Sequence, residues 1–286
     1  MRLRFLHRDD AIAHGVEMTN RPATFDSQAA TFDRRAGLSE QHCQTIAQAV
    51  LRLAEAMPGD LIFEVGAGTG MLGTWLARPP LRYVGLDLSR VMLAAFHRRM
   101  ASSGHMSLLL RADGDHLWPL ADGAVRVIFS SRALHLLDLA HVVDESCRVA
   151  QPDGASLIIG RIQRPTDSLP TLLQQAMQRL LRRQGFSIHA GEQHQRQLLT
   201  AFAQRGGTVL DPVVVVRWTV TRTPWQSIEA WQSKSGLAGL DVPAVVQRAT
   251  LAELRSWAQA VFGDLHQEVS CEEAYVLQGV GLPPSV

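Results

Sequence analysis

Four glycines stand within eight positions directly after an apolar run, in the stretch LIFEVGAGTGMLG. Gly66, Gly68 and Gly70 alternate with other residues, so the backbone can bend sharply there and a ligand can contact its N–H groups without meeting a β-carbon. Glu64 stands two residues before the first of these glycines and gives the pattern E-x-G-x-G-x-G. The stretch predicts a ligand-binding turn between a strand and a helix.

Two cofactors compete for such a turn. The segment from Gly68 to Gly73 matches the dinucleotide pattern G-x-G-x-x-G. That pattern begins at the end of the strand, here at Gly66, and would then need a glycine where Met71 stands. A nicotinamide-dependent oxidoreductase is therefore disfavoured. Asp87 ends the next apolar run, RYVGLDL, and its two acceptor oxygens suit the neighbouring hydroxyl groups of a ribose.

The elements that would position these residues follow from hydrophobic periodicity. Short apolar runs alternate with helical patterns from about residue 60 to residue 162, which predicts a sheet covered on both faces. Helices are expected at 39–57, with Ser39 as the N-cap, and near 70–77, 90–102 and 139–149. We therefore expect an α/β fold with a doubly wound, mostly parallel, seven-stranded, Rossmann-like sheet and helical cap insertions after strand five.

The expected domain organisation is simple. Residues 1–23 are expected to form a flexible N-terminal extension, and residues 24–286 a single domain. Within it, 58–162 would be the cofactor-binding core. The remainder, 163–286, would supply the cap and the acceptor-binding elements.

Along residues 24–162 the chain resembles the class I S-adenosylmethionine-dependent methyltransferases, in particular the small-molecule types 11 and 25. The resemblance rests on E-x-G-x-G-x-G, on Asp87, and on RADGDHLWPLADGAVRVIFSS, in which Asp113 precedes a Leu-Trp-Pro segment. It implies S-adenosyl-L-methionine as the cofactor and methyl transfer to a small-molecule acceptor. FDSQAATFDRRAGL is similar to the segment that closes over the cofactor in this family.

The resemblance also implies roles for individual residues. Asp87 would bind the ribose hydroxyls, Asp113 would face the adenine amino group, and Glu64 would anchor the ammonium of the cofactor. An arginine, Arg34 or Arg35, would pair with the methionine carboxylate. The implied cofactor-binding residues are Glu64, Gly66, Ala67, Gly68, Gly70, Asp87, Leu88, Met92, Ala112, Asp113, Gly114, Ser130 and Arg35.

His135 is the candidate general base, because it follows the fourth strand near the expected methyl group and an imidazole titrates near neutrality. A structural histidine bonded to backbone is the alternative. Two residues depart from the family pattern: Trp118 is inserted between Leu and Pro, and Arg126 replaces an aspartate. Gly73 is expected to allow close helix packing. The cap helices near 168–205 and four tryptophans, Trp218, Trp225, Trp231 and Trp257, are expected to form the acceptor pocket.

Composition narrows the function classes. The 28 basic and 27 acidic residues nearly cancel, so no broad positive field is available for nucleic acid or an anionic membrane. The three cysteines form no ligand pair, which disfavours a metal site, and no apolar run is long enough for a membrane span. A cytoplasmic protein is expected, and its oligomeric state, a homodimer included, stays open.

Three alternatives to small-molecule methylation remain. One is carboxyl methylation of a carrier-protein-bound acid, as in biotin synthesis. Another is a family member that binds the cofactor to assist a rearrangement or cyclisation. The third is a catalytically silent protein that binds S-adenosylmethionine.

Overall fold

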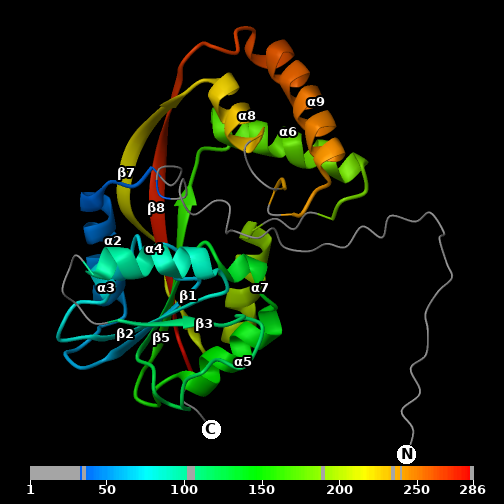
Figure 1. The fold of residues 1–286 in the computed structure, drawn as a ribbon. Coiled ribbons are helices and arrows are strands. Elements are labelled where there is room, and N and C mark those ends of the chain that lie inside the picture. Colours follow the sequence, from blue (N-terminus) through cyan, green and yellow to red (C-terminus); the bar gives the residue numbers. More distant parts are fainter. Residues whose placement is uncertain are drawn as a thin grey trace, which may run out of the picture.

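The computed structural model describes residues 33, 37–101, 107–187, 191–232, 236–238 and 240–283. At its centre is a sheet with the strand order β3-β2-β1-β4-β5-β8-β6, and β7 pairs with β8 off this path (Figure 1). The strands are β1 (Leu61–Val65), β2 (Arg82–Asp87), β3 (Leu108–Arg111), β4 (Val127–Ser131), β5 (Ser156–Gln163), β6 (Thr208–Val209), β7 (Val213–Arg222) and β8 (Val269–Gly281).

The sheet confirms the predicted α/β class but has eight strands rather than seven. Strands β1 to β5 are parallel, and β6, β7 and β8 are antiparallel additions at one side. The extra strand arises because the long β8 has two pairing partners along one edge, the short β6 near one end and β7 over most of the rest. All five parallel strands carry their carboxyl ends to the same edge, where the glycine turn lies.

Helices cover both faces of the sheet. One apolar cluster joins the sheet to α2 (Glu40–Leu53), α3 (Gly73–Leu76) and α4 (Arg90–Ala101). The other joins it to α5 (Leu139–Val149) and α7 (Gly191–Gln204). The predicted N-cap of the first of these helices is confirmed, because Ser39 Oγ accepts a hydrogen bond from the His42 backbone N–H at 3.1 Å.

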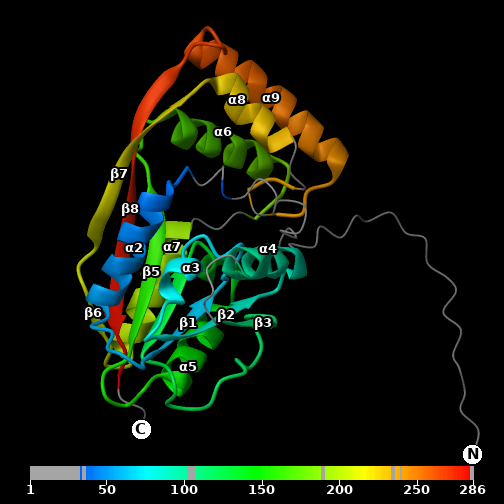
Figure 2. The ribbon, with the colours of Figure 1, turned by 60° about the vertical axis from the view of Figure 1, so that its left-hand side comes forward.

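The cap contains one helix fewer than expected from the 168–205 segment, because α7 is not part of it. It consists of α6 (Leu169–Arg183), α8 (Pro224–Gln232) and α9 (Ala244–Phe262), which share an apolar core of their own above the sheet (Figure 2). Helix α7 was expected in this cap, yet Leu198 and Phe202 bury its apolar face against the sheet. Trp225, Trp231 and Trp257 pack on the cap core, whereas Trp218 of β7 contacts the His42 ring of α2.

A two-stranded ribbon connects the cap to the core. The amino-terminal part of β8 pairs with β7 alone, and its carboxyl-terminal part also pairs with β5. Where β5 ends, Arg164 Nε donates to Glu273 Oε1 at 2.6 Å, and the Glu273 side chain is only 1% exposed. This buried ion pair fixes the point at which the chain leaves the core for the cap.

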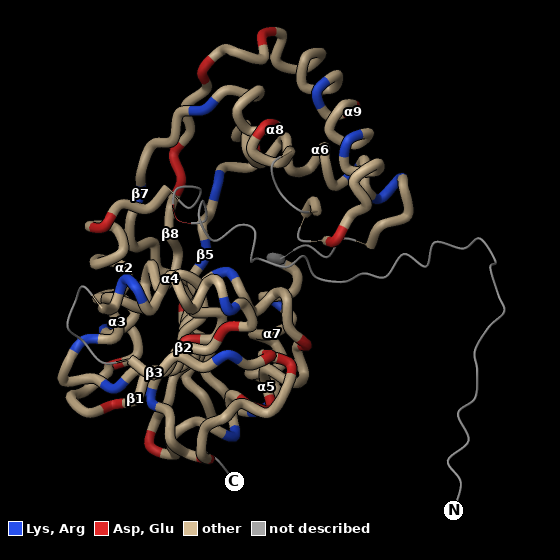
Figure 3. The backbone as a smooth tube through the Cα atoms, viewed as in Figure 1, with Lys and Arg blue, Asp and Glu red and all other residues tan. Residues whose placement is uncertain are grey.

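Acidic and basic residues are interspersed over core and cap (Figure 3). In the part of the chain that the structure describes, no helix is both long and apolar enough to cross a bilayer. The same residues contain no group of three potential metal ligands, and the three cysteines are free thiols.

Candidate functional site

The turn after β1 adopts a conformation that requires glycine. Gly66, Gly68 and Gly70 have φ values of 73°, 56° and 75°, in the left-handed region that other residues rarely adopt. The N–H groups of Gly66 and Ala67 both donate to the Leu86 carbonyl, at 2.8 and 2.9 Å. The turn is thereby fastened to the end of β2.

The glycines of the turn differ in what surrounds them. A β-carbon at Gly66 would overlap Ala133, and one at Gly70 would overlap the Phe96 ring. At Gly73 it would overlap Tyr83 and Phe96, which agrees with the close packing expected there. At Gly68 it would meet nothing closer than a carbonyl oxygen at 3.9 Å. Gly68 is therefore the glycine of this turn that a ligand can approach.

Asp87 faces this open position from the end of β2. Its Oδ2 accepts a hydrogen bond from Gly68 N–H at 2.8 Å, and its Oδ1 accepts one from Ser89 N–H, also at 2.8 Å. Next to it the apolar side chain of Leu88 is 61% exposed. The edge of the sheet at the ends of β1 and β2 thus carries the half-buried Asp87 carboxylate, the Gly68 backbone and the exposed Leu88 side chain.

The loop after β3 lies beside this edge. The Ala112 N–H donates to the Asp87 carbonyl at 3.3 Å, and Asp113 Oδ1 accepts from Asp115 N–H at 3.1 Å. Gly114 packs against Leu137, with no room for a β-carbon. The structure therefore brings Ala112, Asp113 and Gly114 to the same edge as Asp87.

The two departures from the family pattern both have structural roles. Trp118 is 1% exposed, packs against Phe63, and donates its indole N–H to the Gly114 carbonyl at 3.0 Å. Arg126 donates to the Asp153 carbonyl at 2.7 Å and so anchors the turn before β5. Neither residue displaces the glycine turn.

Glu64 lies beneath the turn and is 2% exposed. The Tyr83 hydroxyl donates to Glu64 Oε2 at 2.5 Å. Burial raises the pKa of Glu64 to about 8, against the opposing effect of the Tyr83 hydrogen bond and with a smaller contribution from the negative Asp87. At neutral pH the protonated form of Glu64 therefore predominates.

Three other predicted cofactor residues are buried in the structure. Ser130 is fully buried and donates to the Val65 carbonyl at 2.8 Å, linking β4 to β1. Met92 is 2% exposed in the core beneath α4, and Ala67 is buried against Gly85. Arg34 and Arg35 lie outside the described residues, as do Phe25 and Phe32.

His135 belongs to a 3₁₀ turn, η2 (Leu134–Leu136), that follows β4. The residue is exposed at the surface. The protein around it lowers the pKa of His135 below its usual value, and the charges of His194 and Arg132 lower it further. The imidazole is therefore neutral at pH 7, the state in which it can accept a proton.

The sequence reasoning missed Asp33, which binds the glycine turn. Its Oδ1 accepts from the Thr69 hydroxyl at 2.5 Å, and its Oδ2 accepts from Arg99 of α4. The segment FDRRAG is part of a stretch that resembles the one closing over the cofactor in the family. Nothing in its pattern distinguishes Asp33 from the other residues of that stretch.

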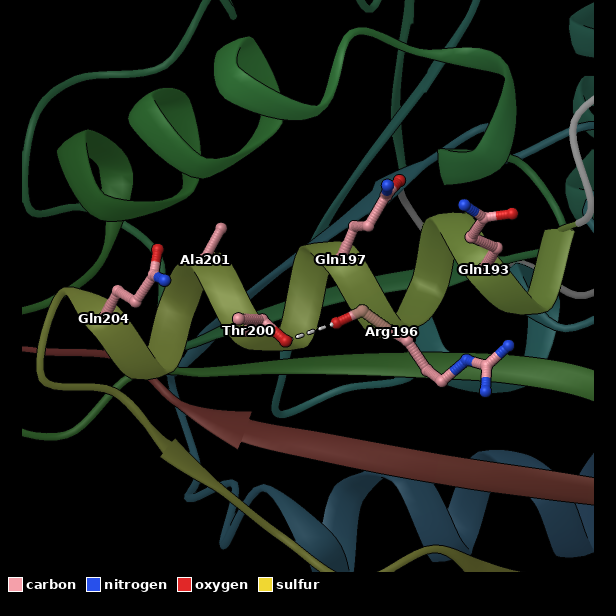
Figure 4. A pocket seen from close by; sticks show the side chains of 6 residues that line it. All are labelled: Gln193, Arg196, Gln197, Thr200, Ala201 and Gln204. Carbon is pink, nitrogen blue, oxygen red and sulfur yellow. Dashed lines mark hydrogen bonds between the residues drawn. The ribbon is translucent and has the colours of Figure 1, made fainter.

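A surface hollow of about 420 Å³ lies along α7, and no residue of the glycine turn lines it (Figure 4). All its lining residues come from that one helix. They are Gln193, Arg196, Gln197, Thr200, Ala201 and Gln204. No residue predicted for the site is among them.

Residues 63–158 match the family model for a methyltransferase domain, and they contain the glycine turn, Asp87, Asp113 and His135. This part of the chain is a methyltransferase domain. The matched region begins inside β1 and ends inside β5, so it coincides with the parallel part of the sheet.

A relative of this methyltransferase domain is the malonyl-[acyl-carrier protein] O-methyltransferase of Laribacter hongkongensis (strain HLHK9). It is 34% identical over 143 residues, which cover 46% of this chain and 47% of that protein. The chain thus spans about half the length of the curated relatives it matches.

Solved structures share the fold of the methyltransferase domain at low sequence identity. The [4+2]-cyclase SpnF has a TM-score of 0.55 at 19% identity, with 91% of this chain and 93% of that chain covered. The YcgJ protein of Bacillus subtilis has a TM-score of 0.53 at 18% identity, with 82% and 97% covered.

Proposed function

We propose that this protein is an S-adenosylmethionine-dependent methyltransferase that acts on a small-molecule acceptor. The observation that carries the proposal is the hydrogen bond from Gly68 N–H to Asp87 Oδ2, made in a turn of three glycines with positive φ. It puts a carboxylate and accessible backbone together at the carboxyl ends of β1 and β2, where open α/β sheets bind nucleotides.

The residues around Asp87 fit the parts of this cofactor. Both oxygens of Asp87 accept hydrogen bonds from the backbone, and a carboxylate is an acceptor group that suits the hydroxyls of a ribose. Exposed Leu88 offers an apolar surface to the adenine ring, and Asp113 in the adjoining loop offers an acceptor for its amino group. When bound, the cofactor supplies an electrophilic methyl group on a positively charged sulfur.

We assign Glu64 to the ammonium end of the cofactor. Without the cofactor, burial of the carboxyl group raises the pKa of Glu64 to about 8. A nearby positive charge favours the ionised form of such a group. Cofactor binding at pH 7 would then be coupled to loss of a proton from Glu64.

The acceptor is held by residues above the carboxyl end of β4. The task of the protein is to align the acceptor atom with the methyl carbon and to exclude water, for which the cap above the sheet is suited. If the acceptor is a hydroxyl or an amine, the neutral His135 can take its proton.

A carrier-protein-bound acid is a second candidate acceptor. It is favoured by the relative from Laribacter hongkongensis, which is named for methylation of a malonyl group on acyl-carrier protein. The partner of this chain would then be a carrier protein that delivers the acid as a thioester.

Binding of S-adenosylhomocysteine, measured by calorimetry with NADPH as the comparison ligand, tests the cofactor assignment. We expect the purified protein to bind S-adenosylhomocysteine and not NADPH. Asp87→Ala should weaken this binding by about 1.5 to 3 kcal/mol, the range for hydrogen bonds to a charged group. Asp211→Ala, at an exposed residue outside the site, is the matched control. Equal affinity in both variants would contradict the role of Asp87.

A further inference from the structure

Ser131, the last residue of β4, lies on the same face of the sheet as Glu64. In the register of β4 with β1, Phe129 pairs with Glu64, and Ser131 follows two residues later, level with the start of the glycine turn. Side chains two residues apart on a strand point to the same face. The adjacent Ser130, predicted for the cofactor site, has its hydroxyl bonded to the Val65 carbonyl instead. Ser131 is therefore the serine of β4 that shares the face of Glu64 at this edge.

Tyr275 of β8 reaches Ser131 across the strand that separates them. Gly160 of β5 pairs with Ser131, and Tyr275 pairs with Ile162, two residues further along β5. A β-carbon at Gly160 would overlap the Tyr275 hydroxyl, so the phenol crosses β5 over this glycine. Tyr275 Oη and Ser131 Oγ lie 2.6 Å apart. A residue 144 positions away in the sequence thus contacts the end of β4 directly.

The burial of Tyr275 decides which of the two hydroxyls is the donor. Tyr275 is 0% exposed, and burial raises the pKa of its phenol, which therefore keeps its proton at neutral pH. A buried O–H group needs an acceptor, and within the described part of the chain the partner of this hydroxyl is Ser131 Oγ. Tyr275 therefore donates and Ser131 accepts.

This arrangement leaves the proton of Ser131 for a ligand. A serine hydroxyl has one O–H donor and two acceptor lone pairs, and the bond from Tyr275 occupies one of the lone pairs. The O–H of Ser131 then points away from Tyr275. Because Ser131 is only half-buried, a bound molecule can meet this donor at the carboxyl end of β4.

The role assigned to Glu64 indicates which group the donor meets. Glu64 is assigned to the ammonium of the cofactor, and in an amino acid the ammonium and the carboxylate are attached to the same carbon. The carboxylate therefore lies close to Glu64, and it only accepts hydrogen bonds. We propose that the Ser131 hydroxyl donates to the carboxylate at the amino acid end of S-adenosylmethionine, and that Tyr275 is the positioning residue that orients it.

The inference rests on the proposed function and adds a contribution from β8 to the cofactor site. The Tyr275 hydroxyl, the Ser131 hydroxyl and the carboxylate form a chain in which each hydrogen bond polarises the next. Loss of the first member therefore weakens the last bond without touching the ligand.

Calorimetry with two ligands tests the inference. S-adenosylhomocysteine carries the carboxylate, whereas its decarboxylated analogue keeps the ammonium and lacks the carboxylate. We expect Ser131→Ala to weaken binding of S-adenosylhomocysteine by about tenfold to a hundredfold, the effect of losing a hydrogen bond to a charged group. Binding of the decarboxylated analogue should be unchanged, because it offers the hydroxyl no carboxylate.

Tyr275→Phe removes the phenol oxygen and keeps the ring that packs in the core. It should weaken S-adenosylhomocysteine binding by less than Ser131→Ala does, because Ser131 keeps its hydroxyl and loses only the bond that orients it. In Ser131→Ala/Tyr275→Phe the affinity should equal that of Ser131→Ala alone, since two residues that act through one contact are not additive. The double variant also leaves no buried phenol without a partner, so a loss in it is not a folding defect from an unpaired hydroxyl.

Ser270→Ala is the matched control. Ser270 forms a similar hydroxyl pair with Thr221 between β8 and β7, 2.7 Å apart and exposed, so this variant should leave both affinities unchanged. Failure of the wild type to bind S-adenosylhomocysteine would refute the proposed function, and the inference with it. If the wild type binds, no loss in Ser131→Ala, or an equal loss for both ligands, would overturn the role of Ser131. Wild-type affinity in Tyr275→Phe would overturn the positioning role of Tyr275 alone.

Discussion

Asp33, ahead of the first described helix, accepts a hydrogen bond from the hydroxyl of Thr69 in the glycine turn, with the two oxygens 2.5 Å apart. Thr69 is only 3% exposed, so the bond is made beneath the surface of the turn. The second oxygen of Asp33 accepts from Arg99 of α4. One carboxylate thereby joins the amino-terminal segment, the turn and a helix on the same face of the sheet.

Asp33→Ala should weaken S-adenosylhomocysteine binding, because the glycine turn would lose the hydrogen bond that holds Thr69 in place. We expect a loss of about tenfold in affinity, equivalent to about 1.4 kcal/mol, the scale of one hydrogen bond to a charged group. Calorimetry measures it, with Asp211→Ala as the control. Affinity equal to the wild type would show that the turn holds its shape without Asp33.

Gly70→Ala should destabilise the fold more than Gly59→Ala. Both glycines have positive φ, 75° and 90°, so alanine costs about 1 kcal/mol of backbone strain at either position. Only at Gly70 does the new methyl group also overlap Phe96, whereas Gly59 has open space around it. Overpacking adds about 1 to 3 kcal/mol, which urea denaturation can resolve. Equal losses would show that the Phe96 ring moves aside freely.

Glu64→Gln should change how stability depends on pH. The pKa of Glu64 is about 8 in the folded protein and 4.5 in its ordinary state, so the folded protein binds the proton more tightly. This group therefore contributes stability below about pH 4.5, and the contribution is lost as the pH rises to about 8.

Urea denaturation of the wild type and Glu64→Gln at pH 5.5, 7 and 8.5 measures this effect. Relative to the variant, the wild type should lose stability across that range, by an amount on the order of a few kcal/mol. A difference that does not vary with pH would mean that Glu64 is ionised throughout.

His135→Gln separates the acceptor classes. With an acid acceptor we expect kcat to be retained, because a carboxylate has no proton to lose. With a hydroxyl or amine acceptor, loss of a general base costs about a hundredfold to ten-thousandfold. Initial rates from pH 6 to 9 are measured with malonyl-coenzyme A, a thioester that stands in for the carrier-bound acid. A hundredfold loss of kcat in the variant at pH 7.5 would contradict the expectation that a carboxylate acceptor needs no general base.

Local signals allowed part of this structure to be predicted. Ser39 caps its helix, the glycines follow β1, and Asp87 ends β2 as the sequence indicates, because each is specified by neighbours within a few residues. The alternation of apolar runs with helical patterns was enough to predict the α/β class. The family resemblance added Asp113, whose loop lies beside Asp87.

Contacts between distant residues could not be predicted in this way. Asp33 and Thr69 are separated by 36 positions, and no periodicity links a single aspartate to a threonine so far away. The left-handed conformation of Arg132 is likewise not indicated by its residue type, and its N–H donates to the carbonyl of Gly160, which is distant in the sequence.

The position of α7 illustrates a related limit. Its apolar face was evident from helical spacing, yet spacing does not reveal whether that face meets the sheet or the cap. The eighth strand was missed for a comparable reason, because pairing at both ends of β8 depends on where β6 and β7 return to it.

The length of β8 decides how the cap is attached. The strand runs unbroken from Val269 to Gly281, with its first part beside β7 only and its last part within the central sheet. Its pairing with β7 shifts register between Val214 and Val216, and a bulge bends a pair of strands locally. A change in the position of the cap relative to the sheet would therefore be accommodated first at this irregularity.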